Sequence, residues 1–493
     1  MIANTLVSIP AKVKIPPSAA RVEPRSPASV TLSSMNGLPP GPSEPPVIQL
    51  VRWLVRPIAF LESCRRRFGD SFSMRFPGFE RPMVILSHPE AVQALYTAPE
   101  HGLPPGRTIS LLPVLGPSSV LLLEGREHLA RRRLMLPPFH GERMRSYESI
   151  MREAAERDME TWSQDRPFAI HPHMQSITLE VILRAVFGVS DRDSGERARR
   201  LRERLPALLG EISSPALQFR FLLASRFGRG DPLARMREIA AGVDELLFAE
   251  IAERRCDSGL VEREDILSLL LSARFEDGSE MSDSELRDQL LTLLLAGHET
   301  TATGLAWTLD LLLRHPAVLE RLTAAVDAGE ETYPRAVVWE SLRLRPVVPL
   351  AGRRLASELD SDRLKLPAGT DVTPAIWLTH TRADLYPEPY AFRPQRFLEE
   401  PPSGYGWIPF GGGVRRCLGA SFAELEMRVV LETVLRERVL QKLDARAERV
   451  TRRNVTLSPR NGTVVRASRR LDAATSGPQV PSVARVQPVG VVS

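Results

Sequence analysis

One glycine-rich run decides the fold of this chain, and it reads Phe410-Gly411-Gly412-Gly413-Val414-Arg415-Arg416-Cys417-Leu418-Gly419. Glycines ahead of a cysteine let the backbone turn tightly and let peptide N–H groups approach the sulfur. Arg415 and Arg416 add positive charge beside Cys417, and a helical pattern begins at about Leu418, so its positive end also favours an anion there. Such donors and cations lower the pKa of a thiol. The run predicts a thiolate in a tight loop, although a lone cysteine is more often a buried structural residue.

A long helix is predicted over residues 282–314. Ser282 and Glu285 form the S-x-x-E pattern of a capping box, and Pro316 stops the helical periodicity. At about 1.5 Å per residue, such a helix is roughly 45 Å long. Its middle is apolar on nearly every face, and this pattern predicts a helix that crosses the interior of the protein.

Polar residues interrupt the middle of this helix in the run Ala296-Gly297-His298-Glu299-Thr300-Thr301. A buried charge needs a reason, because its desolvation is costly. Small residues let a flat group approach the helix, a Thr hydroxyl can bond back to a carbonyl, and Glu299 with Thr300 can pass protons. The alternative is ordinary back-bonding in a buried helix. A glycine, an acid and two threonines together favour a functional site.

Together the two runs resemble the cytochrome P-450 family. The glycine-rich run matches the family's haem-binding loop, Phe-x-x-Gly-x-Arg-x-Cys-x-Gly, and the helix matches its oxygen-activation segment, small-Gly-x-acid-Thr. The resemblance implies haem b with Cys417 as the iron ligand, and a thiolate ligand favours O–O cleavage. It also implies that Arg415 pairs with a haem propionate, that Phe410 packs on the thiolate side, and that Glu299 and Thr300 are the catalytic pair.

The resemblance implies further haem contacts at Ala296, Gly419, His128, Arg132 and Arg353. His128 and Arg132 are four residues apart and share a helix face, which alone would indicate a basic surface helix. A dianionic haem edge needs several cations, and arginine is the best bidentate donor. Arg354 remains an alternative to its neighbour Arg353.

A third match is Glu340-Ser341-Leu342-Arg343, within a helix predicted over residues 336–344. An acid and a base at i and i+3 share a face, and alone they most often form a solvated pair. The family adds a downstream arginine, which Arg396 resembles, whereas Gln395 departs from the Glu of many relatives. We expect this trio to lock the haem-side core, without a catalytic role.

The composition limits the alternatives. The 493 residues carry a formal net charge of +5, which is too small an excess to indicate nucleic-acid binding. The three cysteines, Cys64, Cys256 and Cys417, share no C-x-x-C spacing, so neither a disulfide framework nor a zinc or iron–sulfur site is expected. No apolar run is long enough to span a membrane. We expect a cytoplasmic monomer without a membrane anchor.

Three segments are predicted along the chain. Residues 1–45 are a flexible Pro/Ser-rich leader, residues 46–468 the haem-thiolate monooxygenase domain, and residues 469–493 a disordered tail.

The body is predicted to be mainly α with a small β portion. Helical pattern covers residues 47–68 and most of 89–335, and a hairpin is predicted from strands at 71–76 and 83–86. Short strands return around 364–372 and 455–465, with a tight turn at Asn461-Gly462. By resemblance the fold is a triangular helix-rich prism, with the haem between the long helix and the Cys417 loop.

The resemblance implies a monooxygenase that uses O₂ to hydroxylate or epoxidise a hydrophobic small molecule such as a fatty acid, terpenoid, steroid or polyketide. No dinucleotide fingerprint follows Gly419, so electrons are expected from a separate ferredoxin or flavodoxin with its reductase. We hypothesise that Arg131, Arg133 and Arg416 face an acidic partner. The alternatives are a peroxide-using or isomerising haem-thiolate enzyme and a haem sensor or carrier, none of which needs Glu299 with Thr300.

The substrate pocket is predicted to be apolar. The candidate contacts are Leu112, Leu295, Val347, Val348 and Leu350, with further wall residues within 208–221.

Overall fold

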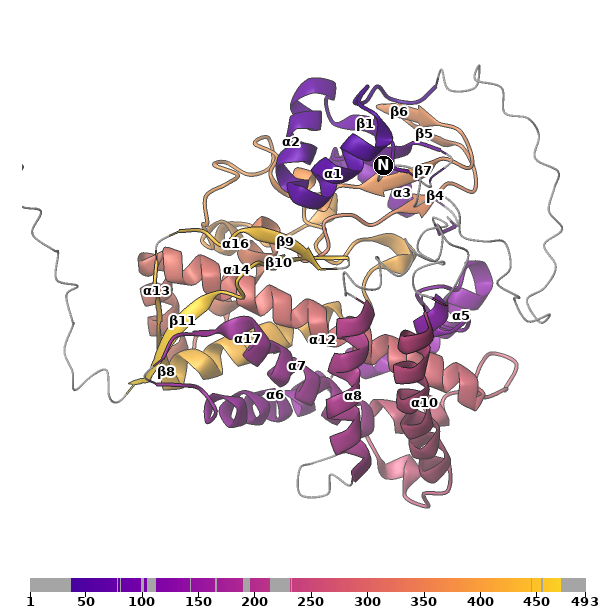
Figure 1. Ribbon diagram of the computed structural model, residues 1–493, viewed down its shortest axis with the longest axis vertical. Helices are drawn as coiled ribbons and strands as arrows, with labels where there is room; N and C mark the ends of the chain where they lie inside the picture. Colours follow the sequence, from indigo (N-terminus) through magenta and orange to yellow (C-terminus); the bar gives the residue numbers. More distant parts are fainter. Residues whose placement is uncertain are drawn as a thin grey trace, which may run out of the picture.

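The computed structural model describes residues 37–470 except 78, 80, 99–101, 104–111, 142, 165, 189–195, 213–230, 232, 445 and 454. A large helical region carries a smaller region with a β-sheet at one end (Figure 1). The main helices of the helical region are α5 (Gly125–Met135), α6 (Arg143–Met159), α7 (Ile170–Phe187), α8 (Glu196–Ile212), α10 (Ala234–Arg255), α11 (Ile266–Ser272), α12 (Asp283–Arg314), α13 (Pro316–Asp327), α14 (Thr332–Leu344) and α17 (Ala420–Glu437). The expected class, mainly α with a small β portion, is confirmed.

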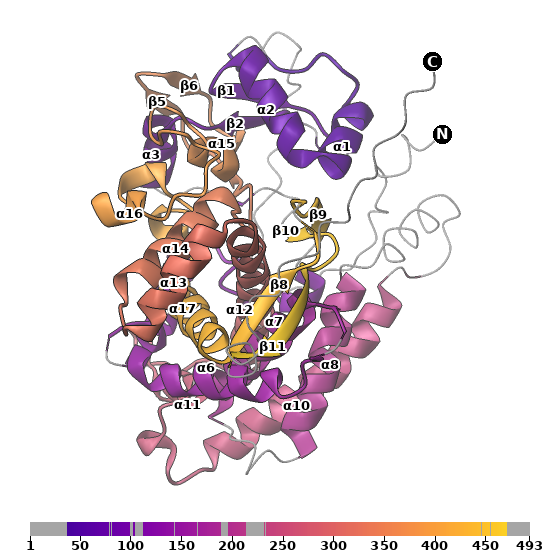
Figure 2. The ribbon, with the colours of Figure 1, turned by 90° about the vertical axis from the view of Figure 1, so that its left-hand side faces the viewer.

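The long predicted helix is α12, which spans 32 residues through the helical region (Figure 2). Both bonds of the Ser282/Glu285 capping box are formed, and the helix ends at Arg314 before Pro316, as predicted. It packs against α7, α10, α14 and α17, and it belongs to the largest hydrophobic core cluster. The rest of the helical region is therefore built around this one element.

The region at the end of the molecule contains a four-stranded sheet with the order β1-β2-β7-β4. Its strands are β1 (Ser71–Met74), β2 (Met83–Leu86), β7 (Asp371–Pro374) and β4 (Arg353–Arg354). The predicted hairpin is the antiparallel β1–β2 pair, whereas β2 and β7, far apart in the sequence, pair in parallel. Beside the sheet lie α1 (Pro46–Val55), α2 (Pro57–Phe68), α3 (Pro89–Thr97), α15 (Ile376–His380), β5 (Leu359–Ser361) and β6 (Leu364–Leu366).

The helical pattern predicted over residues 47–68 is two helices rather than one. The break lies at Arg56, whose φ of −142° and ψ of 65° are not helical. Proline disfavours the helical conformation of the residue before it, and Pro57 begins α2.

The C-terminal strands lie against the helical region. They are β8 (Arg438–Lys442), β9 (Val450–Arg453), β10 (Thr456–Pro459) and β11 (Val464–Arg469), with β3 (Phe168–Ala169) joining β11, and α16 (Arg396–Glu399) precedes them. The predicted turn at Asn461-Gly462 is present, and Gly462 adopts a φ of +70°. It closes no hairpin, because β10 pairs with β9 while β11 pairs with β8 and β3.

The folded region begins before residue 46. Ser73 donates hydrogen bonds to the carbonyl oxygens of Pro40 (3.0 Å) and Pro39 (2.7 Å), so these prolines lie on β1. The rest of the predicted leader, residues 1–36, and most of the predicted tail, residues 471–493, lie outside the described residues. In the part of the chain that is described, no helix combines the length and apolarity needed to cross a membrane.

Candidate functional site

The glycine-rich run forms a closed loop ahead of α17. The amide of Cys417 donates to the carbonyl oxygen of Phe410 at 2.9 Å, and a short 3₁₀ turn over Gly413–Arg415 lies between them. Gly411 and Gly413 have φ values of +69° and +63°, which side-chain-bearing residues rarely adopt. The predicted tight turn is therefore confirmed.

Two of the glycines let this loop lie directly on α3. A Cβ at Gly412 would come within 2.6 Å of the Tyr96 ring, and one at Gly413 within 2.2 Å of the Tyr96 carbonyl oxygen. Gly419 differs, because a Cβ there would meet nothing within 4 Å. Open space therefore lies beside Gly419, two residues after the cysteine.

Cys417 as a residue has exposed surface, but protein atoms surround its sulfur densely. Burial is the largest influence on its pKa and raises it, against the lowering effects of a hydrogen bond from the Gly419 backbone and of Arg132 and Arg416. The lowered pKa expected from the sequence is therefore wrong for the protein alone, because desolvation outweighs the cations. A thiol that coordinates a metal loses its proton through the metal's own charge.

Three arginines gather near Cys417, and we call Arg132, Arg353 and Arg415 the arginine cluster. Burial lowers the pKa of all three, and that of Arg415 falls to about 10 because Arg353 and Arg132 also repel its charge. Glu124 acts in the opposite direction on Arg415. Among the described residues, none of the three forms an ion pair with a carboxylate. The cluster has an excess of positive charge.

The structure distinguishes Arg353 from Arg354. Arg354 forms a two-pronged ion pair with Asp371, at 2.8 Å for both hydrogen bonds. Arg353 is buried, donates to the Gly352 carbonyl oxygen, and stacks its guanidinium 5.7 Å from the centre of the Tyr96 ring. Arg353 is thus the member of the pair that lies with Arg415, and His128 of α5 is buried on the same helix as Arg132.

The cations expected to face a redox partner differ in their exposure. Arg131 is buried and pairs with Glu285 at the start of α12, so the hypothesis is wrong for this residue. Arg133 is exposed but pairs with Glu276. Arg416 is exposed next to Cys417.

The middle of α12 has an exposed window in an otherwise buried helix. Ala296 is exposed, and Leu295, Gly297, Glu299 and Thr300 are partly exposed. The Thr300 hydroxyl donates to the Ala296 carbonyl oxygen at 2.6 Å, and the Thr301 hydroxyl donates to the Gly297 carbonyl oxygen at 3.0 Å. This is the back-bonding predicted from the sequence.

Helix α17 places the Cys417 loop close to this window. Glu426 of α17 hydrogen-bonds Thr301, and Met427 lies against Gly304 of α12. Only about 9 Å of helix separates the start of α17 from this crossing. The Cys417 loop and the exposed window of α12 therefore lie close together.

These observations fit a haem. A flat group needs open space beside its ligand, and Cys417, Gly419 and Ala296 are exposed to such space. Two propionates need cations, and the arginine cluster has cations without ion-pair partners. The loop itself offers one thiolate, that of Cys417, as a metal ligand.

The predicted trio of Glu340, Arg343 and Arg396 is assembled. Arg343 binds both carboxylate oxygens of Glu340 at 2.7 and 2.8 Å, and Arg396 reaches the same carboxylate at 3.1 Å. Glu340 and Arg343 have no exposed surface, so the alternative of a solvated pair is wrong. Arg343 also donates to the backbone oxygens of His380, Pro389 and Ala391.

The predicted substrate contacts are dispersed. Val347 is buried against Gly304 of α12, Val348 is partly exposed, and Leu350 forms a bridge with Ala375. Leu295 lies in the exposed window, and Leu112 is exposed. Residues 213–221 of the predicted wall lie outside the described residues.

Three residues at the site were not predicted: Glu426, Gln175 and Tyr96. Glu426 is buried on α17 between Phe422 and Val430, which share its helix face. An acid on an otherwise apolar helix face is visible in the sequence and could have identified this residue. Gln175 donates to Glu299 at 2.5 Å. No sequence pattern marks this contact, because it joins α7 to α12.

The chain matches the family model described as Cytochrome P-450 over residues 39–464. Cytochrome P-450 135B1 of Mycobacterium bovis is 42% identical to it over 90% of this chain and 94% of its own length. Cytochrome P-450 137 of Mycobacterium tuberculosis is 41% identical over 81% of this chain and 83% of its own length.

Solved structures share the fold. Retinoic-acid-bound cyanobacterial CYP120A1 superimposes on this chain with a TM-score of 0.75 and is 24% identical in sequence. The match covers 88% of this chain and 99% of the CYP120A1 chain. The haem domain of cytochrome P-450DA gives the same TM-score at 23% identity and covers 88% of this chain and 98% of its own. At this level of identity the likeness concerns the fold alone.

Proposed function

The chain belongs to the cytochrome P-450 family of haem-thiolate monooxygenases, which bind haem b, and from this premise we propose a specific reaction and site for it. The substrate is a hydrophobic small molecule of the fatty acid, terpenoid, steroid or polyketide class, which is hydroxylated or epoxidised. Electrons come from a separate ferredoxin or flavodoxin with its reductase. Leu295, Val347, Val348 and Leu350 are the proposed apolar contacts, because Leu295 lies in the α12 window and Val347 packs against Gly304 of the same helix.

The residues proposed to hold the haem follow from the geometry around Cys417. Cys417 supplies the iron ligand, and Phe410 and Gly419 flank it. The arginine cluster and His128 bind the propionates, with Arg353 chosen over Arg354 because Asp371 already satisfies Arg354. Ala296 forms the opposite wall.

The proposed mechanism assigns proton delivery to α12. When bound, the haem supplies dioxygen activation and transfer of one oxygen atom to the substrate. The Thr300 hydroxyl is held by the Ala296 carbonyl oxygen at 2.6 Å, so its lone pairs are free to accept a hydrogen bond in the window. Glu299 is the next residue, and burial raises the pKa of its carboxyl, which makes it a better proton donor near neutral pH. Glu299 and Thr300 together move protons from solvent to the reacting oxygen.

One observation carries this proposal: a cysteine with exposed surface lies in dense protein beside three arginines that lack ion-pair partners among the described residues. It predicts that Cys417→Ala abolishes the red-shifted Soret band of the reduced carbon monoxide complex. The measurement is a difference spectrum of the purified, haem-loaded variant, with Cys64→Ala as the control cysteine. A variant that kept the band would rule out Cys417 as the ligand.

A second prediction concerns Thr300. Replacing it with Ala should lower the product formed per O₂ consumed by roughly tenfold to a hundredfold, because a positioned proton-transfer group is lost. Product and O₂ are measured together with surrogate redox partners, and Thr301→Ala is the matched control. Equal coupling in both variants and the parent would refute the relay.

A further inference from the structure

A cleft lies on the side of α12 where the Glu299 side chain is found. Its volume is about 840 Å³, and residues of α6, α7, α8, α12 and β9 line it. The charged residues in its wall are Arg157, Asp158, Glu180, Arg202, Glu299 and Arg453. Polar groups in this wall can hold water beside Glu299.

Glu299 is held in the wall of this cleft by α7. The Gln175 amide donates to Glu299 Oε2 at 2.5 Å, and His171 Nε2, one turn earlier on α7, lies 3.9 Å from Glu299 Oε1. His171 also contacts the Thr303 hydroxyl at 3.2 Å, and Thr303 hydrogen-bonds Glu299 one helix turn away. The carboxyl is fixed on this face, while Ala296 and Thr300, four residues apart, share the other.

Few of the charged groups nearby affect the pKa of the Glu299 carboxyl. Burial lowers the pKa of His171 to about 3 and that of His298 to about 4, so both are neutral at physiological pH. Arg453 of β9 is the cation that lowers the pKa of Glu299, and Gln175 and Thr303 lower it by hydrogen bonding. Burial has the largest effect and raises it. Across the cleft, Asp158 bonds His173 and Glu180 pairs with Arg202.

We propose that Gln175 is a positioning residue that holds the Glu299 carboxyl at the cleft, and that Arg453, a cation in the wall of the same cleft, helps to control its exchange of protons with cleft water. This inference rests on the proposed role of Glu299 in proton delivery. Glu299 takes a proton from cleft water and gives one up through water to the helix face that carries Thr300, so no electron is moved and no reactant besides water is needed. Because a neutral amide makes the closest contact, the carboxyl can take up and release a proton without breaking a salt bridge.

The test is a titration of the Glu299 carboxyl. Its infrared C=O band is identified as the band that Glu299→Gln removes, and it is followed against pH in the haem-loaded protein. Gln175→Met keeps the length of the side chain but removes the donor to the charged form, so the Glu299 pKa should rise. Arg453→Gln should also raise the Glu299 pKa. Because Arg453 is on β9 and Gln175 is on α7, the test remains valid if one of the two variants misfolds.

Arg202→Gln is the matched control, because Arg202 lines the same cleft but pairs with Glu180. The expected result is an upward shift in Gln175→Met and Arg453→Gln, none in Arg202→Gln, and an equal upward shift in the pH at which coupling to product changes. No shift in the first two variants, or an equal shift in the control, overturns the inference. If Glu299→Gln itself leaves coupling unchanged, the proposed function of Glu299 fails, whatever the titration shows.

Discussion

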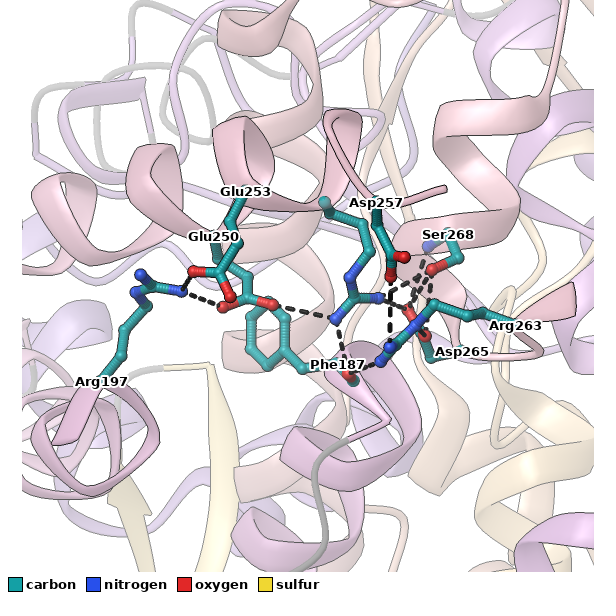
Figure 3. A network of polar contacts seen from close by, with 9 residues as sticks. Phe187, Arg197, Glu250, Glu253, Asp257, Arg263, Asp265 and Ser268 are labelled. Carbon is teal, nitrogen blue, oxygen red and sulfur yellow. Dashed lines mark hydrogen bonds and ion pairs between the residues drawn. The ribbon is translucent and has the colours of Figure 1, made fainter. Parts of the chain in front are cut away.

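Two groups of arginines in this molecule differ in whether acidic side chains neutralise their charge. Around Arg254, buried on α10, every charge finds an opposite one: Arg254 bonds Asp265 at 2.6 Å and Glu250 at 2.9 Å, and Arg263 bonds the other oxygen of Asp265 (Figure 3). Ser268 and the Phe187 carbonyl oxygen complete this Arg254 network. Among the described residues, the arginine cluster near Cys417 has no such partners, and Arg353 and Arg132 lower the pKa of Arg415.

The difference separates a structural cluster from a binding site. A network that satisfies its own charges ties α7, α10 and α11 together and needs nothing from outside. A cluster of partly buried cations that repel one another is stabilised when an anion binds to it. Three predictions follow this contrast, in order of their effect on the free energy of unfolding of the haem-free protein.

The largest effect is expected from breaking the Arg254 network. Arg254→Met removes the buried cation that Asp265 and Glu250 share and leaves them only the more exposed Arg263 and Arg197. This should cost about 3–5 kcal/mol. Denaturant unfolding with and without haem measures it, and the loss should be the same in both. A loss below about 1 kcal/mol would show that the network is not self-sufficient.

An intermediate effect is expected from Glu426, a buried acid with one carboxylate oxygen that has no hydrogen-bond partner. Burial raises its pKa well above the usual value of 4.5, so the folded protein keeps a proton that the unfolded chain releases above about that pH. Stability should therefore fall with rising pH by up to about 1.4 kcal/mol per unit between these two pKa values. Glu426→Gln should abolish this fall. Unfolding curves from pH 5 to 8 test it, with Glu437→Gln, an exposed acid at the end of the same helix, as the control. An unchanged slope would contradict a protonated Glu426.

The smallest effect on the haem-free protein is expected at the arginine cluster. Arg353→Met loses one hydrogen bond to a backbone carbonyl but relieves repulsion from Arg415, so stability should change by less than about 1 kcal/mol. The same variant should lose haem at least about tenfold faster, because a propionate partner is gone. Haem transfer to apomyoglobin measures this rate, with Arg354→Met as the control. A loss of stability like that of Arg254→Met would erase the contrast between the two groups.

Much of this fold could be predicted because its signals are local. Ser282, Glu285 and Pro316 set the ends of α12 through capping and chain geometry, and the glycines of the Cys417 loop set its turn. These effects act over a few residues and can be read from the sequence. The same holds for the pairing of Glu340 with Arg343 on one helix face.

The rest depends on contacts between distant segments. The choice of Arg353 over Arg354 required Asp371, and the partner of Glu299 required α7 to lie along α12. The direction of the Cys417 pKa was wrong because the sequence shows nearby charges but not the depth of burial that opposes them. The break at Arg56 was missed, although the effect of Pro57 is local.

The parallel pairing of β2 with β7 has a consequence for the newly made chain. The first strands of the sheet leave the ribosome long before residues 371–374 exist, and the core beside α1 and α2 also needs Ala375, Trp377 and Leu378. At about 5–20 residues per second, that wait is roughly 15–60 s. During it the N-terminal hairpin offers an open edge that can pair with another chain. Chaperone capture during synthesis should therefore centre on residues 46–86.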